Sequence, residues 1–256
     1  MPFILLLLLV ACQAGPAQAP APPEKPLDPK DPRSVVEHAA HATRSQKSYE
    51  AEWTARLLVP GSDPLDYKGQ AVFVSPGVLY SHYTASGGDE KNIVRAGNRA
   101  WVWASALGEW VTAQEMGMPG AGKGLQNPDE ALALMAKAKG EARVVAPGTV
   151  ELALAGADLA SLMKEQAQDG SFEWAKSQAT VRLTVDDQSR LKALKVTASL
   201  TSADPKVKGV VDYSADVAVK GYNGKTELVF LDEKKKPIPL TPKMQEAIQQ
   251  VLKGAK

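Results

Sequence analysis

The chain has one cysteine and no excess of charge of either sign, and each scarcity excludes a feature or a class of partner. Its 30 basic and 29 acidic residues leave a formal charge of +1, without the basic footprint that nucleic acids or anionic bilayers attract. A single cysteine forms no internal disulfide, so packing must stabilise the fold. No G-x-S-x-G nucleophile elbow is present.

The longest apolar run, Phe3 to Ala11, is too short for a membrane-spanning helix, which needs about 20 residues. It has the length of the apolar core of a signal peptide. Its last residues and the one cysteine, Leu9-Val10-Ala11-Cys12, resemble the bacterial lipobox. This resemblance implies that the first eleven residues are a lipoprotein signal peptide and that Cys12 is lipidated. The alternative is a buried or accidental cysteine.

A Pro/Ala-rich segment follows, and residues 12–30 are interpreted as the acylated cysteine and its tether. Such a composition forms no core and favours extended polyproline conformations. At about 3.1 Å per residue, the tether would reach roughly 55–60 Å. Gln13 replaces the Asp that is the usual inner-membrane retention signal of bacterial lipoproteins. The outer membrane, facing the periplasm, is therefore the expected location, and residues 31–256 are expected to form a single domain.

Periodicity predicts four helices and many short strands in this domain. The helices are expected from Asp31 to about Ser45, from Asn127 to Ala138, from Asp158 to Gln168, and after Thr241-Pro242. The strands are expected at Tyr49–Leu57, Tyr67–Ser75, Val78–Ala85, Lys91–Ala96, Ala100–Ala104, Glu109–Ala113, Glu141–Val145, Thr149–Ala155, Thr180–Asp186, Leu191–Thr201, Val210–Gly221 and Lys225–Leu231. Asn223-Gly224 is the hairpin signal before the last of these strands.

This order of elements predicts an α+β fold, because strands come in runs instead of alternating with helices. A long antiparallel sheet cannot leave an apolar face in water and tends to curl. We therefore expect a strongly curved antiparallel sheet, a half-open β-barrel, with helices covering its concave face.

The order also resembles that of the LolA/LolB-like superfamily, which includes periplasmic lipoprotein carriers and LppX/LprG-type lipid-binding lipoproteins. The resemblance rests on the helix before Ser48–Trp53, the hairpin from Gly69–Phe73 to Leu79–Ser81, the segment Arg99–Trp103, and the meander from Ala179 onwards. It implies an incomplete barrel closed by helices around an apolar cavity that binds acyl chains or a lipidated protein. It implies no reaction.

Large apolar residues in the first half of the sheet are the candidates for lining such a cavity. They are Trp53, Leu57, Phe73, Leu79, Tyr83, Trp101, Trp103 and Trp110. The side chains of Trp101 and Trp103 share a face because they are two residues apart in a strand. The alternative is that all eight simply pack in an ordinary core.

Other motifs are given plainer interpretations. Gly117 to Lys123 has the G-x-x-x-x-G-K spacing of a phosphate-binding loop, but Gly124 replaces its Ser or Thr, so a flexible loop over the cavity mouth is expected. The histidines three apart on the first helix lack further metal ligands, and His82 has no identifiable nucleophile partner. Asp186-Asp187 is interpreted as a turn, and Lys234 to Lys236 as a solvated loop. No metal or cofactor is expected.

These features predict a membrane-anchored envelope lipoprotein that binds the acyl chains of lipids or lipoproteins in an apolar half-barrel. Its partners would be the membrane, through the lipid anchor, and those acyl chains, with the protein itself a monomer. The alternative is a non-enzymatic interaction or signalling protein of the envelope, with a filled core and no lipid ligand. An enzyme ranks third, because no residue set forms a recognisable catalytic group.

Overall fold

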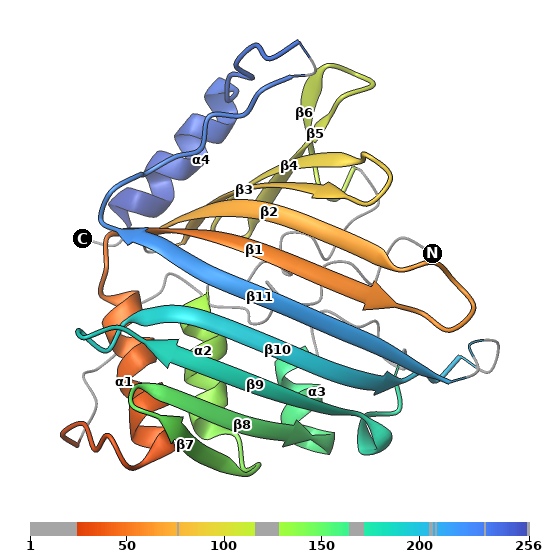
Figure 1. Ribbon diagram of the computed structural model, residues 1–256. Coiled ribbons are helices and arrows are strands. Elements are labelled where there is room, and N and C mark those ends of the chain that lie inside the picture. The colour runs from red at the N-terminus through yellow and green to blue at the C-terminus, as the bar shows by residue number, and fades with distance from the viewer. Residues whose placement is uncertain are drawn as a thin grey trace.

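The computed structural model describes residues 25–75, 77–115, 128–163, 172–204, 207, 209–232 and 234–254 (Figure 1). The helices are α1 (Pro32–Arg44), α2 (Pro128–Lys137), α3 (Gly156–Met163), the 3-10 helix η2 (Trp174–Lys176) and α4 (Pro242–Lys253). The strands are β1 (Ser48–Leu58), β2 (Leu65–Val74), β3 (Val78–Ala85), β4 (Glu90–Ala96), β5 (Arg99–Ala104), β6 (Glu109–Thr112), β7 (Ala142–Ala146), β8 (Thr149–Ala155), β9 (Gln178–Val185), β10 (Leu191–Thr201) and β11 (Val210–Tyr222). The ends of these strands lie within two residues of the predicted ones.

All the named strands form one antiparallel sheet in the order β6-β5-β4-β3-β2-β1-β11-β10-β9-β8-β7. The first six run outward from the centre to one edge, and the last five run inward from the other edge. The two meanders therefore meet at the centre, where Trp53 of β1 lies opposite Val217 of β11. The sheet is open and curved, with β6 and β7 as its edges (Figure 1). The predicted α+β composition with a large antiparallel sheet is confirmed.

The two faces of the sheet differ, because successive residues of a strand point to opposite sides. The face called here the α1 face carries apolar side chains on nearly every strand, such as Leu57, Leu152 and Leu200, and packs with α1, α2 and α3. The opposite face, called the α4 face, has an apolar cluster over β2 to β6. Over the remaining strands the α4 face is mostly polar.

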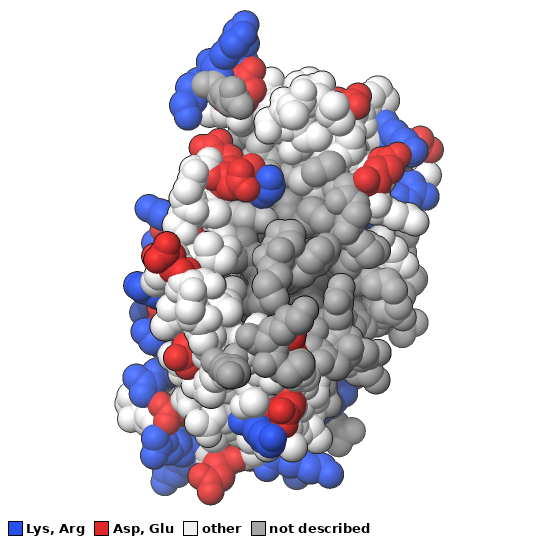
Figure 2. All heavy atoms as spheres, turned by 90° about the vertical axis from the view of Figure 1, so that its right-hand side faces the viewer, with Lys and Arg blue, Asp and Glu red and all other residues white. Residues whose placement is uncertain are grey.

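Ion pairs cross this polar part of the α4 face from strand to strand. Lys220 pairs with Glu52 (2.9 Å), Lys195 with Asp216 (3.4 Å), and Arg182 with Glu151 (2.7 Å). Figure 2 shows charged side chains of both signs interspersed along the left side of the molecule. Opposite charges on neighbouring strands favour the observed register, although each such exposed pair contributes only about 0.2–1 kcal/mol.

Helix α1 begins where its sequence predicts, because Asp31 caps it and Pro32 occupies its first turn. The Asp31 carboxylate accepts a hydrogen bond from the backbone N–H of Arg33 (2.9 Å). One face of the helix buries Val36 and Ala39 against the α1 face of the sheet. The Thr43 hydroxyl oxygen accepts a hydrogen bond from the N–H of Leu191 (2.8 Å), which ties the end of α1 to the start of β10.

Helix α4 lies on the other side of the sheet from α1, and the prediction that the helices share one face is wrong for it. Its buried residues, Met244, Ala247 and Ile248, pack in the apolar cluster of the α4 face with side chains from β2 to β6. The amphipathic pattern predicts that α4 has a buried side. It does not indicate which face of the sheet receives that side.

The prediction of a strand at Lys225–Leu231 is also wrong. This segment forms only an isolated bridge, between Leu231 and Pro237. The physical reason is that β11 already pairs with β1 on one side and with β10 on the other, so β11 has no free edge for a hairpin with the segment that follows it. Asn223 does mark a turn, with a positive φ of 57°.

Several predicted features lie outside the described residues. These are the signal peptide, Cys12, most of the tether, the loop from Gly117 to Lys123 and the predicted end of the third helix at Gln168. Residues 25–30 of the tether are described and are exposed.

Candidate functional site

The eight residues predicted to line a cavity lie on two different faces of the sheet. The α1 face carries Trp53, Leu57, Phe73, Leu79 and Tyr83. The α4 face carries Trp101, Trp103 and Trp110. Trp101 and Trp103 do share a face, as their spacing predicts. Strand alternation fixes that relation, but not which side of the sheet the pair occupies.

The three tryptophans of the α4 face are packed by the protein itself. The ring of Trp110 meets the rings of Trp103 and Phe230 edge to face, at centroid distances of 5.6 and 5.3 Å. Its indole N–H donates to the carbonyl oxygen of Pro239 (3.0 Å). These tryptophans therefore hold α4 and the chain before it against the sheet. They do not meet the five candidates of the α1 face.

On the α1 face, the register of β1, β2 and β3 places side chains in three parallel rows. The first row is Tyr49, Phe73 and Leu79, the second is Ala51, Ala71 and Ser81, and the third is Trp53, Gly69 and Tyr83. The second, called here the small-residue row, lies between two rows that carry aromatic rings. Large residues on both sides of small ones give this part of the sheet a low strip between two raised borders.

In each of the two outer rows, an aromatic ring of β1 contacts a ring on another strand. Tyr49 of β1 and Phe73 of β2 stack at a centroid distance of 4.7 Å. In the other row, the rings of Trp53 and Tyr83 are 5.7 Å apart. Such aromatic pairs contribute about 0.5–1.5 kcal/mol beyond their buried area, so both borders are held in place.

Gly69 allows the ring of Trp53 to lie flat across β2. A Cβ atom at Gly69 would lie 2.5 Å from the Trp53 ring, closer than side-chain atoms tolerate. The absence of a side chain there brings the indole over the backbone of β2, toward Tyr83. Sequence reasoning singled out Trp53 but not Gly69, because the pairing of the two depends on strand register.

Two buried polar atoms that β1 and β3 place on this face have no hydrogen-bond partner. They are the indole nitrogen of Trp53 and the hydroxyl of Ser81, whose residues are 8 % and 1 % exposed. A buried polar group left unpaired costs about 1–3 kcal/mol, so native proteins seldom retain one. Sequence analysis missed Ser81, because a serine in a strand carries no signal of burial.

Burial also raises the pKa of two tyrosines on this face, Tyr83 in the row beside the small-residue row and Tyr67 in the row after that. Burial raises the pKa of Tyr83 to about 12, with further contributions from Tyr67 and Asp89. The pKa of Tyr67 rises to about 12 for the same first reason. Both phenols therefore stay protonated and neutral well above physiological pH, and the aromatic border carries no charge.

Tyr83→Phe should make the protein less sensitive to alkali. The unfolded chain releases the Tyr83 proton near pH 10, whereas the folded protein holds it to about pH 12. Ionisation therefore favours the unfolded state as the pH rises through this window, and stability falls. Urea unfolding at about pH 8 and about pH 11 should show a smaller drop in midpoint for the variant than for the parent. Equal drops would contradict this account.

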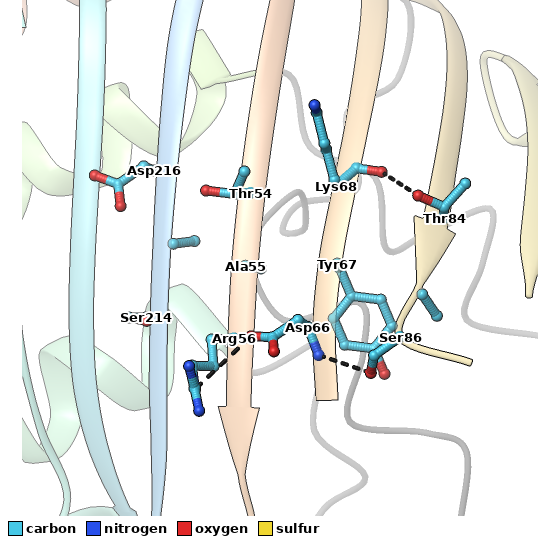
Figure 3. A pocket seen from close by; sticks show the side chains of 12 residues that line it. Thr54, Ala55, Arg56, Asp66, Tyr67, Lys68, Thr84, Ser86, Ser214 and Asp216 are labelled. Carbon is cyan, nitrogen blue, oxygen red and sulfur yellow. Dashed lines mark hydrogen bonds and ion pairs between the residues drawn. The ribbon is translucent and has the colours of Figure 1, made fainter. Parts of the chain in front are cut away.

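Two grooves of the described chain lie elsewhere and are lined by none of the eight candidates. The first, of about 390 Å³, crosses β11, β1, β2 and the end of β3 and is shown in Figure 3. Arg56 and Asp66 form an ion pair in it (3.7 Å), and the N–H of Asp66 donates to the Ser86 hydroxyl (3.0 Å). The second, of about 690 Å³, shares Arg56 and Ser214 with the first. Both have mixed linings without a concentration of large apolar side chains.

Three residues of the remaining motifs, Asp186, His82 and His38, have structural partners. Asp186 closes a turn by accepting from the Arg190 N–H (2.9 Å) and pairing with its guanidinium (2.7 Å). His82 Nδ1 hydrogen bonds to the Asn92 side-chain oxygen (2.7 Å), and His38 Nδ1 donates to the Ser34 carbonyl (2.8 Å). In the described ranges no three potential metal ligands cluster, and no helix has the length and apolarity to cross a bilayer.

Comparison with known proteins returned similar structures only. No protein-family model matches the chain, and no curated protein matches its sequence. Lipoprotein LppX of Mycobacterium tuberculosis is 12 % identical with a TM-score of 0.40, covering 76 % of this chain and 96 % of that one. A LolA superfamily protein of Nitrosomonas europaea is 12 % identical (TM-score 0.31), covering 76 % and 93 %. The MucA/MucB complex of Pseudomonas aeruginosa gives 13 % identity (TM-score 0.34), covering 75 % and 58 %.

Proposed function

We propose that this protein binds acyl chains of lipids or lipoproteins on the α1 face of the sheet, along the small-residue row. The observation that carries the proposal is the row itself, a strip of Ala51, Ala71 and Ser81 between two aromatic borders. An acyl chain is narrow, flexible and apolar, and it matches a strip lined by methyl groups and ring faces. Strand register keeps this strip straight across three strands.

The proposal places the protein in a bacterial envelope. The apolar run before Cys12 supports export, and the match to the lipobox supports a lipid anchor at that cysteine, in the outer membrane facing the periplasm. The open sheet is then a half-barrel whose concave side, under α1 to α3, receives the ligand. The role is binding instead of catalysis, performed by a monomer without a cofactor. A protein held by its own lipid would receive or hand over its ligand at that membrane.

One observation favours the alternative, an interaction protein whose core is filled. Ala71, Phe73 and Leu79 are at most 2 % exposed without any ligand present. An acyl chain could reach the small-residue row only if the atoms that now cover it move aside. In the alternative they never do, and the protein acts through its outer surface.

The experiment compares acyl binding to two matched variants in the full chain carrying Cys12→Ala, so that the protein's own anchor is not counted. Ala71→Leu fills the small-residue row, whereas Ala96→Leu enlarges an equally buried alanine in the cluster of the α4 face. Both overpack a core, and such overpacking typically costs about 1–3 kcal/mol of stability. Only Ala71→Leu should weaken binding of a fluorescent fatty acid, by about tenfold or more, because only its side chain occupies the ligand's space.

The outcomes separate the two proposals. Loss of binding in Ala71→Leu alone supports the acyl site. Equal loss in both variants would contradict the placement of the site. If the parent binds no fatty acid, and native mass spectrometry finds no lipid in protein purified from membranes other than its anchor, the filled-core alternative holds.

A further inference from the structure

Two hydrogen-bond donors face the same side of the sheet from either side of β2, and neither has a partner. They are the indole N–H of Trp53, on β1, and the hydroxyl of Ser81, on β3. Both residues are more than nine-tenths buried. A polar group in an apolar interior costs free energy unless something pairs with it, so this pair indicates a missing acceptor.

The backbone register brings these donors close together. Trp53 lies opposite Gly69, and its indole nitrogen is 2.7 Å from the point where a Gly69 Cβ would be. The N–H is therefore over β2, not over its own strand. Ser81 lies opposite Ala71, two residues along from Gly69. Diagonal neighbours on adjacent strands are separated by about 7–8 Å, a span that a group with two acceptor oxygens, such as a carboxyl or an ester, can bridge.

The surroundings define the chemistry of that acceptor. Tyr83 borders the site in its neutral, protonated form, and the flanking rows are aromatic or aliphatic across β1, β2 and β3. On β4 the same two rows continue into the basic residues Lys91 and Arg95, which also favour an oxygen acceptor. Trp is a donor only, and a serine hydroxyl can donate, so the complementary group presents oxygen lone pairs. A carbonyl or carboxyl oxygen at one end of an apolar chain has this character, and the small-residue row begins at Ser81.

We propose that Trp53 and Ser81 bind the two oxygens of the carboxyl or ester group of an acyl ligand, either a free fatty acid or an acyl ester, while its chain lies along the small-residue row. This inference rests on the proposed function and adds which end of the ligand is recognised. It also explains why the fold keeps two unpaired polar atoms in a core. Their cost in the free protein is offset when the ligand binds.

The test uses two donor variants and a matched control in the full chain carrying Cys12→Ala. Trp53→Phe removes the N–H and keeps an aromatic ring, and Ser81→Ala removes the hydroxyl. Ser48→Ala is the control, because Ser48 is also 1 % exposed with an unpartnered hydroxyl, but it lies on the α4 face. The ligands are a pyrene-labelled fatty acid, its methyl ester, and a pyrene-labelled alkane of equal chain length.

Each donor variant should bind the fatty acid or the ester about three- to tenfold more weakly, the range expected for one hydrogen bond. Alkane binding should not change in either variant, and Ser48→Ala should bind all three ligands as the parent does. Ser81→Ala should also melt no lower than the parent, because it deletes an unpaired buried hydroxyl. Weaker binding without lower stability separates recognition from packing.

The results that would contradict a role for Trp53 and Ser81 differ from those that would contradict acyl binding itself. If the parent binds fatty acid and alkane equally and neither donor variant changes this, the donors are satisfied otherwise, for example by a buried water, and only this inference fails. If a donor variant bound all three ligands equally more weakly than the parent, Trp53 and Ser81 would act through packing, and this inference would also fail. If the parent binds none of the ligands, both proposals fail. Weakening toward the fatty acid but not the ester identifies the free acid as the source of the carbonyl group.

Discussion

Replacing Gly140 with alanine should lower the free energy of unfolding by about 3 kcal/mol, the upper part of the range for overpacking a core. A Cβ atom at this position would lie 1.9 Å from the carbonyl oxygen of Ala153, a backbone atom of β8 that cannot move without distorting the sheet. Hydrogen bonds also hold both backbone polar groups of Gly140 in place. Its N–H donates to the Asp158 carboxylate (2.7 Å), and its carbonyl accepts from the Arg33 guanidinium.

The position matters because Gly140 lies where several elements meet. Arg33 belongs to α1, Ala153 to β8 and Asp158 to α3, so a shift of Gly140 is transmitted to two helices and the sheet. Urea unfolding of the variant and the parent measures the effect as a change in midpoint at constant slope. Gly221→Ala is the matched control, because nothing lies within 4 Å of its Cβ position, and it should stay within about 0.5 kcal/mol of the parent. Equal losses in the two variants would contradict the steric explanation.

Local signals predicted the elements well. Asp31-Pro32 and Thr241-Pro242 mark the starts of α1 and α4 because capping depends only on neighbouring residues. The strands β3, β8 and β10 have the predicted bounds, since alternation and turn residues are also local. In each case the information lies within a few residues of the feature that it determines.

Features that depend on distant parts of the chain were not predictable in this way. The sequence after Asn223 resembles a strand, but β11 pairs with β1, far earlier in the chain, and with β10, so β11 has no free edge with which this segment could pair. The face that Trp101 occupies depends on where α4 packs. The roles of Gly69 and Ser81 depend on the residues of other strands that lie beside them. Residue type and spacing identify candidates for the site, and register decides which of them meet.

Trp110→Ala should cost about 3–5 kcal/mol of stability without changing acyl binding. Trp110 is 8 % exposed, and its ring packs against Phe230 while its N–H bonds to the Pro239 carbonyl. Truncating a buried tryptophan removes both contacts and leaves a cavity, and such changes cost about this much. Since the cluster also holds Met244 and Ile248, amide hydrogen exchange should accelerate first in α4.

Trp110→Phe is the matched control, because it keeps a ring in the cluster and loses the hydrogen bond to Pro239 and only part of the ring volume. It should cost less than Trp110→Ala but more than about 1 kcal/mol, the net contribution of the hydrogen bond alone. Both variants are titrated with fatty acid at a temperature where each is folded. The titration tests whether Trp110, on the α4 face, lies outside the acyl site. Unchanged affinity would place Trp110 in a structural cluster that fastens α4 to the sheet. A loss of affinity in the folded Trp110→Ala protein would show instead that the α4 face contributes to the acyl site, and the site would then have to be rebuilt across both faces of the sheet.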